Sequence, residues 1–134
     1  MDGYEKQANL MKALSHPVRL QILDLLAQGE ACVCHLTAAL RQRQPYISQQ
    51  LMILREAGLV LDRKEGTVVY YRLADGHLTE IIASTRELLS GIGIHAHFPA
   101  LPAEVIEDCP CPRCGSAASA VRPACSDRVP QTPV

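Results

Sequence analysis

The spacing of apolar residues changes once along this chain, near residue 59, and this change constrains the fold more than any other feature. Before it, apolar side chains recur at the intervals of an amphipathic helix. Residues 59–73, LVLDRKEGTVVYYRL, follow a period of two instead, which predicts a strand, a turn through Glu65-Gly66 and a second strand. The helical period then returns from residue 78. The pattern therefore predicts several helices, a β-hairpin and a final helix.

Proline and glycine mark the ends of the expected helices. Pro17, after Ser15-His16, is placed to start the second helix, with His16 as a capping group, and Gly29 can end that helix in a left-handed conformation. The expected helices cover about residues 4–14, 15–28, 31–40, 45–57 and 78–92. The last helix carries so wide an apolar stripe that we expect it to pack on a partner chain.

Two short helices followed by a basic hairpin are typical of a winged helix-turn-helix, here mainly α with one small β-hairpin. The helix from Pro45 would be the recognition helix in the DNA major groove. Side chains at its N-terminal end are expected to be exposed and to contact bases or phosphates: Gln44, Tyr46, Ser48, Gln49 and Gln50. Hairpin side chains are expected on backbone phosphate or in the minor groove: Arg63, Lys64 and Thr67. The alternative is a surface helix with a merely solvated polar face.

The distribution of charge supports nucleic-acid binding better than the total charge does. The net charge is −1, yet residues 41–72 hold six basic against three acidic side chains, and a dimer would double this excess. The chain has neither a signal-peptide pattern at its start nor an apolar run of about eighteen residues, so we expect a cytoplasmic protein. Cytosolic thiols stay reduced, and six cysteines therefore suggest metal or redox chemistry.

Proline usage divides the chain into two parts. Seven of the nine prolines follow residue 98. We therefore expect a DNA-binding and dimerisation domain over residues 1–94 and a mostly irregular, Pro- and Cys-rich tail over residues 95–134.

The segment EACVCHL, residues 30–36, places two thiols where a helix is expected. A helix turns about 100° per residue, so Cys32 and Cys34 would point in nearly opposite directions. A position in the first helical turn would favour the thiolate form of Cys32 that metals require. Binding both sulfurs to one ion would then distort the turn and shift the recognition helix. Alternatively, the two cysteines are small buried hydrophobes.

Three stretches together resemble the ArsR/SmtB family of metal-sensing repressors: ALSHPVRLQILDLL, EACVCHL and QPYISQQLMILREAGLVLDRKEGTVVYYRL. The resemblance covers about residues 8–94. It implies a homodimer through the first and last helices. It also implies a repressor that binds double-stranded operator DNA, an inverted repeat, and releases it when a metal or metalloid binds.

In this resemblance EACVCHL corresponds to the family's metal box, with Cys32 and Cys34 as the box cysteines. His35 replaces an acidic residue, and Thr37 stands where arsenite-responsive members can carry a third cysteine. A three-thiolate site must therefore take a sulfur from elsewhere. The family's alternative site on the last helix is represented by Asp75 and His77 alone, so a zinc or nickel sensor of that type is not expected.

The tail contains EDCPCPRCG, with Cys109, Cys111 and Cys114, and a further Cys125. These thiols complete the site of Cys32 and Cys34, form an autonomous metal site, or have no role. Three thiolates suit arsenite or antimonite as the inducer, and four suit cadmium, lead or zinc. We favour arsenite or antimonite. His35 is expected to be exposed and solvated.

Three other classes remain open to test. A thiol-redox or persulfide sensor on the same fold would respond to oxidant instead of metal. A constitutive DNA-binding dimer with a structural zinc tail would not release DNA at all. An enzyme is not expected, because no nucleophile, base and oxyanion site can be placed together.

Overall fold

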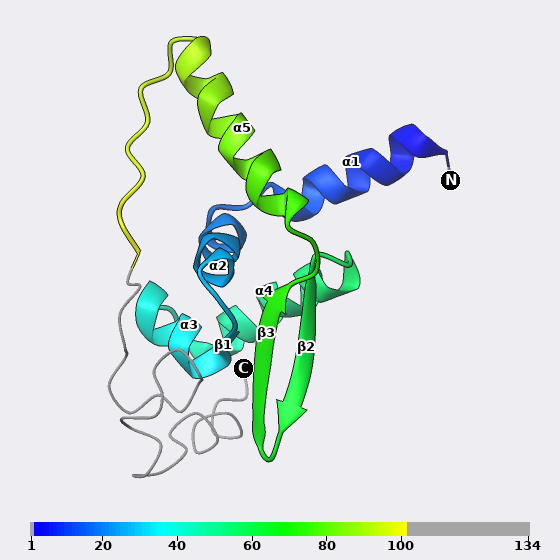
Figure 1. The fold of residues 1–134 in the computed structure, drawn as a ribbon, viewed down its shortest axis with the longest axis vertical. Coiled ribbons are helices and arrows are strands. Elements are labelled where there is room, and N and C mark those ends of the chain that lie inside the picture. Colours follow the sequence, from blue (N-terminus) through cyan, green and yellow to red (C-terminus); the bar gives the residue numbers. More distant parts are fainter. Residues whose placement is uncertain (1, 102–134) are drawn as a thin grey trace.

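The computed structural model describes residues 2–101, and its elements follow the expected order with one addition (Figure 1). The helices and strands are α1 (Gly3–Leu14), α2 (Pro17–Ala27), β1 (Ala31–Cys32), α3 (Val33–Leu40), α4 (Gln44–Glu56), β2 (Val60–Glu65), β3 (Val68–Leu73) and α5 (His77–Gly91). The predicted mainly α arrangement with one hairpin is confirmed. Among the described residues, no helix has the length and apolar character needed to cross a membrane.

Helices α2, α3 and α4 form the core. Their fully buried side chains include Ile22, Leu25, Leu36, Leu51 and Leu54. These residues recur at helical spacing, so each helix contributes one apolar face to a shared interior. At the start of α2, Pro17 occupies the first turn and the His16 ring accepts a hydrogen bond from the Val18 amide, with 3.2 Å between Nδ1 and N. The expected capping role of His16 is confirmed.

The hairpin projects away from the helices, as Figure 1 shows. β2 and β3 pair so that Glu65 lies opposite Val68, which leaves a two-residue loop of Gly66 and Thr67. Gly66 has φ of 64°, in the left-handed region that such loops require. The turn predicted at Glu65-Gly66 is confirmed.

A third strand was not predicted. β1 pairs antiparallel with β3, with Cys32 opposite Tyr70, and the strand order is β1-β3-β2. The expectation that a helix begins near Ala31 is therefore wrong: Ala31 and Cys32 are extended, and α3 begins at Val33. Pairing with β3 supplies backbone hydrogen bonds that a helix would otherwise have supplied locally.

Helix α5 lies against α2, and its buried side chains are Leu78 and Ile82. Beyond α5 the chain turns back (yellow in Figure 1), and the segment Phe98–Leu101 lines a cavity of about 300 Å³ with α2 and α5. Phe98 lies 4.2 Å below the Arg86 guanidinium, and Leu101 packs against the core. The tail cysteines Cys109, Cys111, Cys114 and Cys125 lie outside the described residues.

Candidate nucleic-acid interface and thiol site

The first two turns of α4 present a polar surface, as a recognition helix requires. Gln49 is exposed, and Gln44, Tyr46 and Ser48 are half-buried. The Gln44 side-chain amide donates to the Ser48 hydroxyl at 3.2 Å, so these two side chains lie one helical turn apart on the same face. Pro45 in the first turn removes an amide that would have no helical partner.

Gln50 corrects the sequence-based expectation. Its side chain is only 5% exposed, and its Oε1 accepts a hydrogen bond from the Arg19 guanidinium at 2.8 Å. Arg19 also donates from Nε to the Ala13 carbonyl at the end of α1, at 2.6 Å. The expected exposure of Gln50 is wrong because its place on the helix directs it toward α2. Its contacts give it a structural role.

His16 makes a second link between α2 and α4. Its Nε2 lies 3.3 Å from the Tyr46 hydroxyl, while Nδ1 accepts from the Val18 amide. Since Nδ1 is an acceptor, the neutral ring carries its proton on Nε2 and donates to Tyr46. Tyr46 therefore orients the start of α4 as well as lying near the expected DNA surface.

The hairpin side chains differ in their surroundings. Lys64 and Thr67 are exposed, at the end of β2 and in the loop. Arg63 is bound by two carboxylates: Glu30 at 2.8 and 2.6 Å, and Glu65 at 2.5 Å. These hydrogen bonds, that of Glu30 first, raise the pKa of Arg63 further above its ordinary value. The charge of Arg63 is thus largely compensated within the protein.

The remaining basic side chains surround α4 and the hairpin. Two of these side chains form ion pairs: Arg55 with Asp62, at 3.1 Å, and Arg63 with Glu30 and Glu65. Four basic side chains of residues 41–72 are exposed beside them: Arg41, Arg43, Lys64 and Arg72. Arg41 has φ of 53° and closes α3, so it and Arg43 belong to the turn of the helix-turn-helix. These side chains supply a positive surface for phosphates.

Cys32 and Cys34 lie at the start of α3 and are both buried, at 0% and 5% exposed, and neither is disulfide-bonded. Cys32 is the N-cap of α3, and its sulfur accepts a hydrogen bond from the His35 amide at 3.4 Å. Because Cys32 is extended and precedes the helix, the helical angle between residues two apart does not govern the directions of the two sulfurs. The helical angle therefore does not exclude a ligand shared by the two sulfurs.

The described residues provide two soft donors here and no group of three metal-ligating side chains. His35, expected to be exposed, is fully buried, so that expectation is wrong. A pair of buried thiols fits a thiophilic ion and does not fit magnesium or calcium, which prefer oxygen. Any three-coordinate site requires a further ligand, and the candidates Cys109, Cys111 and Cys114 lie outside the described residues.

The half-site predicted before α5 is a local pair. The Asp75 carboxylate accepts from the His77 amide at 2.8 Å and lies 2.7 Å from the His77 ring Nδ1. These hydrogen bonds lower the pKa of Asp75, and that carboxylate raises the pKa of His77. The Asp75 carboxylate thus satisfies the backbone amide of His77, the first residue of α5.

Sequence reasoning missed two residues that position the site. Arg19 joins α1 to α4, and Glu30 joins the segment before β1 to the hairpin. A basic residue among the apolar side chains of the stretch VRLQIL was a sign of a buried polar contact. Nothing local in the sequence indicated the partner of Glu30.

The sequence matches a known family of regulatory proteins. Residues 16–61, from the N-cap of α2 into β2, match the model of bacterial regulatory proteins of the arsR family. An uncharacterised HTH-type transcriptional regulator of Methanocaldococcus jannaschii is 47% identical over 89 residues, which are 66% of this chain and all of the relative.

Two relatives with a described role match well. The biofilm growth-associated repressor of Agrobacterium fabrum is 49% identical over 61% of this chain and 74% of its own length. The arsenical resistance operon repressor of Escherichia coli is 54% identical over 48% of this chain and 56% of its own length. The identity thus extends to repressors of different named roles.

Solved structures agree with the fold. The Mycobacterium tuberculosis protein Rv0081 matches with a TM-score of 0.63 and 32% identity, over 69% of this chain and 94% of that one. A homodimeric winged helix-turn-helix DNA-binding domain from Mycobacterium bovis matches with a TM-score of 0.62 and 36% identity, over 72% and 90%. This chain therefore belongs to the arsR family of bacterial regulatory proteins: it is a winged helix-turn-helix transcriptional regulator and not an enzyme.

Proposed function

We propose that this protein is a homodimeric, cytoplasmic repressor that binds an operator and releases it when a thiophilic metalloid binds Cys32 and Cys34. The observation that carries this proposal is the position of Cys32. It caps α3, the helix directly before α4, and also pairs with β3 of the hairpin. A ligand on this sulfur thus acts on both DNA-contacting elements.

In this proposal α4 enters the major groove and the hairpin follows the backbone. Gln49 supplies a base contact, since a glutamine amide can bind an adenine edge with two hydrogen bonds. Gln44, Tyr46 and Ser48 complete the contact at the start of the helix, and Lys64 and Thr67 lie on phosphate. A two-fold dimer requires an inverted repeat with half-sites about 10 bp apart or a multiple of that distance.

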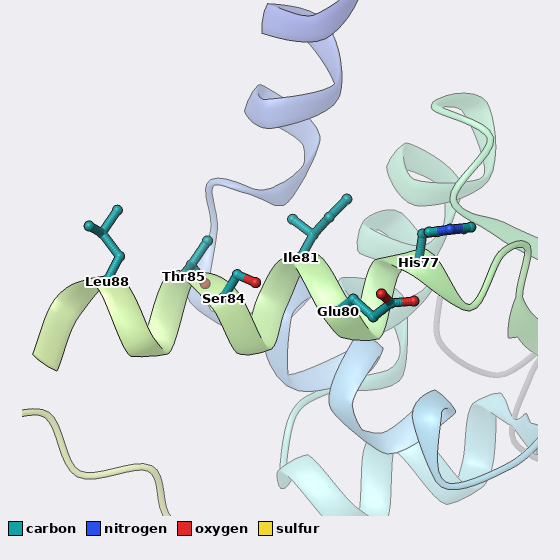
Figure 2. Close-up of a pocket in the computed structure, with 6 residues that line it drawn as sticks. All are labelled: His77, Glu80, Ile81, Ser84, Thr85 and Leu88. Atoms are coloured by element: carbon teal, nitrogen blue, oxygen red, sulfur yellow. The ribbon is translucent and has the colours of Figure 1, made fainter. Parts of the chain in front are cut away.

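The dimer is supported by exposed apolar side chains on α1, on α5 and at Ile92, the residue after α5. Leu88 and Ile92 are 62% and 63% exposed, and Tyr4 and Met11 are 86% and 46% exposed. Figure 2 shows Ile81, Thr85 and Leu88 on one side of α5, where they line a shallow groove. Such a surface on a small domain is typical of an interface. The Mycobacterium bovis relative is described as homodimeric.

The proposed inducer is arsenite or antimonite, bound by three thiolates: Cys32, Cys34 and one of Cys109, Cys111 or Cys114. The segment Phe98–Leu101 supports this assignment because it returns along α2 instead of continuing away from the domain. The eight-residue step from Leu101 to Cys109 spans at most about 26–29 Å. The arsenical resistance repressor of Escherichia coli is among the relatives. The alternative inducers are cadmium, lead and zinc.

Ligand binding must open the start of α3, because Cys32 is fully buried. When the Cys32 thiol bonds to arsenic, it replaces one hydroxyl of arsenous acid, which leaves as water with the thiol proton. The sulfur then gives up its hydrogen bond from the His35 amide and leaves the packed interior. The energy of the new bonds then offsets the loss of the cap and of β1 pairing. The bound state thus favours a different position of α4, which is population shift by a ligand.

Operator-DNA anisotropy with reduced protein tests the proposal. Arsenite, antimonite, cadmium, lead and zinc are each titrated into the complex. Three full-length chains are compared: the wild type, Cys32→Ser/Cys34→Ser, and Cys109→Ser/Cys111→Ser/Cys114→Ser. We expect release by arsenite from the wild type alone. Release from the wild type by cadmium, lead or zinc only would assign a divalent-metal sensor, and release by none of the five ions would overturn metal sensing.

A thiol-redox repressor is the second candidate, and one observation favours it: Cys32, two residues before the second buried thiol of Cys34, lies on a strand paired with the hairpin. One solved relative, HlyU of Vibrio cholerae, is described in a reduced form, at 36% identity and a TM-score of 0.56. Release by hydrogen peroxide that dithiothreitol reverses, without any response to arsenite, would assign this function.

A further inference from the structure

Cys32, Tyr70 and Arg63 occupy one row across the three-stranded sheet. Cys32 of β1 is the register partner of Tyr70 of β3, and Arg63 of β2 is the register partner of the same tyrosine. Directly opposed residues of antiparallel strands place their side chains on the same face. The box cysteine and the hairpin arginine are therefore separated by one side chain.

Arg63 covers this row and reaches across the sheet. Its guanidinium lies 4.7 Å from the centre of the Tyr70 ring, which is buried at 6% exposure. Two of its nitrogens bind both oxygens of Glu30, the residue before β1, at 2.8 and 2.6 Å. A planar guanidinium bound to both carboxylate oxygens above an aromatic ring holds a fixed orientation.

The same contacts make Arg63 a poor partner for phosphate. Its nitrogens bind Glu30 and Glu65, so a phosphate would have to displace a carboxylate and would meet the charge of the other. Lys64, one residue further along the strand, is exposed on the other face. These neighbours therefore form a matched pair for experiment.

We propose that Arg63 and Glu30 are positioning residues that fix the hairpin to the Cys32 segment and carry ligand binding at Cys32 to the DNA-binding surface. When Cys32 moves, β1 and Glu30 move with it, and the hairpin loses the ion pair between Arg63 and Glu30. The ligand-dependent part of this inference rests on the proposed function; the positioning part does not.

The first experiment needs no inducer. Operator affinity is measured against salt concentration for the wild type, Arg63→Gln and Lys64→Gln. A lost phosphate contact lowers the slope of log K against log salt by about 0.9. We expect that change for Lys64→Gln and an unchanged slope for Arg63→Gln. A reduced slope for Arg63→Gln would overturn the inference, because Arg63 would then contact phosphate.

The second experiment follows backbone exchange. Amide hydrogen exchange in β1 and β3 is compared for Glu30→Gln, Arg63→Gln and the double variant, with Lys64→Gln as control. We expect acceleration in Glu30→Gln and Arg63→Gln, none in the control, and no more in the double variant than in Arg63→Gln alone, since Glu30→Gln removes only an interaction that Arg63→Gln already removes. Additive acceleration in the double variant would show that Glu30 and Arg63 act separately and would overturn the proposal.

The third experiment adds arsenite and measures the ratio of operator Kd values with and without it. Coupling between two sites typically amounts to a 5- to 150-fold ratio, and we expect Arg63→Gln to reduce it about fivefold or more. The exchanged pair Glu30→Arg/Arg63→Glu should restore it in part. If the ratio of operator Kd values is unchanged in Arg63→Gln, the proposed coupling through Arg63 is overturned. If arsenite leaves the operator Kd of the wild type unchanged, the proposed inducer is refuted. The salt slope and the amide exchange rates still test the positioning role.

Discussion

Two neighbouring glutamines on α4 have different surroundings and different roles. Gln49 is exposed, whereas Gln50 is 5% exposed and bonded to Arg19. Consecutive side chains on a helix point about 100° apart, so one faces solvent while the next faces α2. The pair therefore allows stability and DNA recognition to be separated with the same substitution.

Gln50→Ala should destabilise the fold by about 1–3 kcal/mol, because it leaves the partly buried Arg19 guanidinium without one acceptor. Gln49→Ala should change the free energy of unfolding by less than about 0.5 kcal/mol. It should instead weaken specific operator binding by about 1–3 kcal/mol with little effect on random DNA. Urea denaturation and anisotropy on both DNAs measure these effects, and equal losses on both DNAs for Gln49→Ala would refute base readout.

The Asp75–His77 pair makes a local contribution to the stability of the fold, and this contribution depends on pH. The pKa of His77 is raised from 6.5, so its contribution to stability is complete below that value and is lost as pH rises through the folded pKa. The pKa of Asp75 is lowered, so its contribution is lost as pH falls through that pKa. Asp75→Asn should return the His77 pKa toward 6.5 in an NMR titration. No change in Asp75→Asn would show that the carboxylate does not cause the shift.

Among the elements, α4 is held by polar contacts at its N-terminal end as well as by its apolar face. Arg19 joins the end of α1 to Gln50, and His16 joins the start of α2 to Tyr46. The recognition helix is thus connected to α1, which carries part of the proposed dimer surface. Through these contacts the proposed dimer would orient α4 directly.

The stability of the hairpin depends on the backbone conformation of its loop. Gly66 has φ of 64°, and a side chain there adopts a left-handed conformation that costs about 1–2 kcal/mol. Gly66→Ala should therefore destabilise the hairpin by about that amount and weaken DNA binding. Gly76→Ala is the matched control, since Gly76 has φ of −65° and open space at its Cβ position. Calorimetry and anisotropy check both variants, and equal melting temperatures would contradict the role of the loop.

For the whole molecule, the proposed dimer depends on the exposed apolar side of α5. Leu88→Glu would place a charge in that interface, and burial of an unpaired charge is strongly unfavourable. We expect Leu88→Glu to sediment as a monomer and to bind the operator at least tenfold more weakly. Met52→Glu, at a residue that is 52% exposed on α4, should remain dimeric. A dimeric Leu88→Glu protein would locate the interface elsewhere.

The local sequence determined the helices, the hairpin and its turn, because apolar periodicity, Pro17, Pro45 and Gly66 act through neighbours close along the chain. It also indicated that His16 caps α2, and it predicted that Cys32 and Cys34 belong to one site. The resemblance to the ArsR/SmtB family rested on three stretches of this sequence.

Tertiary structure decided what depends on distant partners. β1 forms only because β3 lies beside it, so Cys32 is a strand residue and a cap instead of part of a helical turn. Gln50 is turned inward by packing on α2, His35 is buried, and Glu30 binds an arginine 33 residues away. Such contacts arise from the approach of whole elements, which the spacing of residues along the chain does not record.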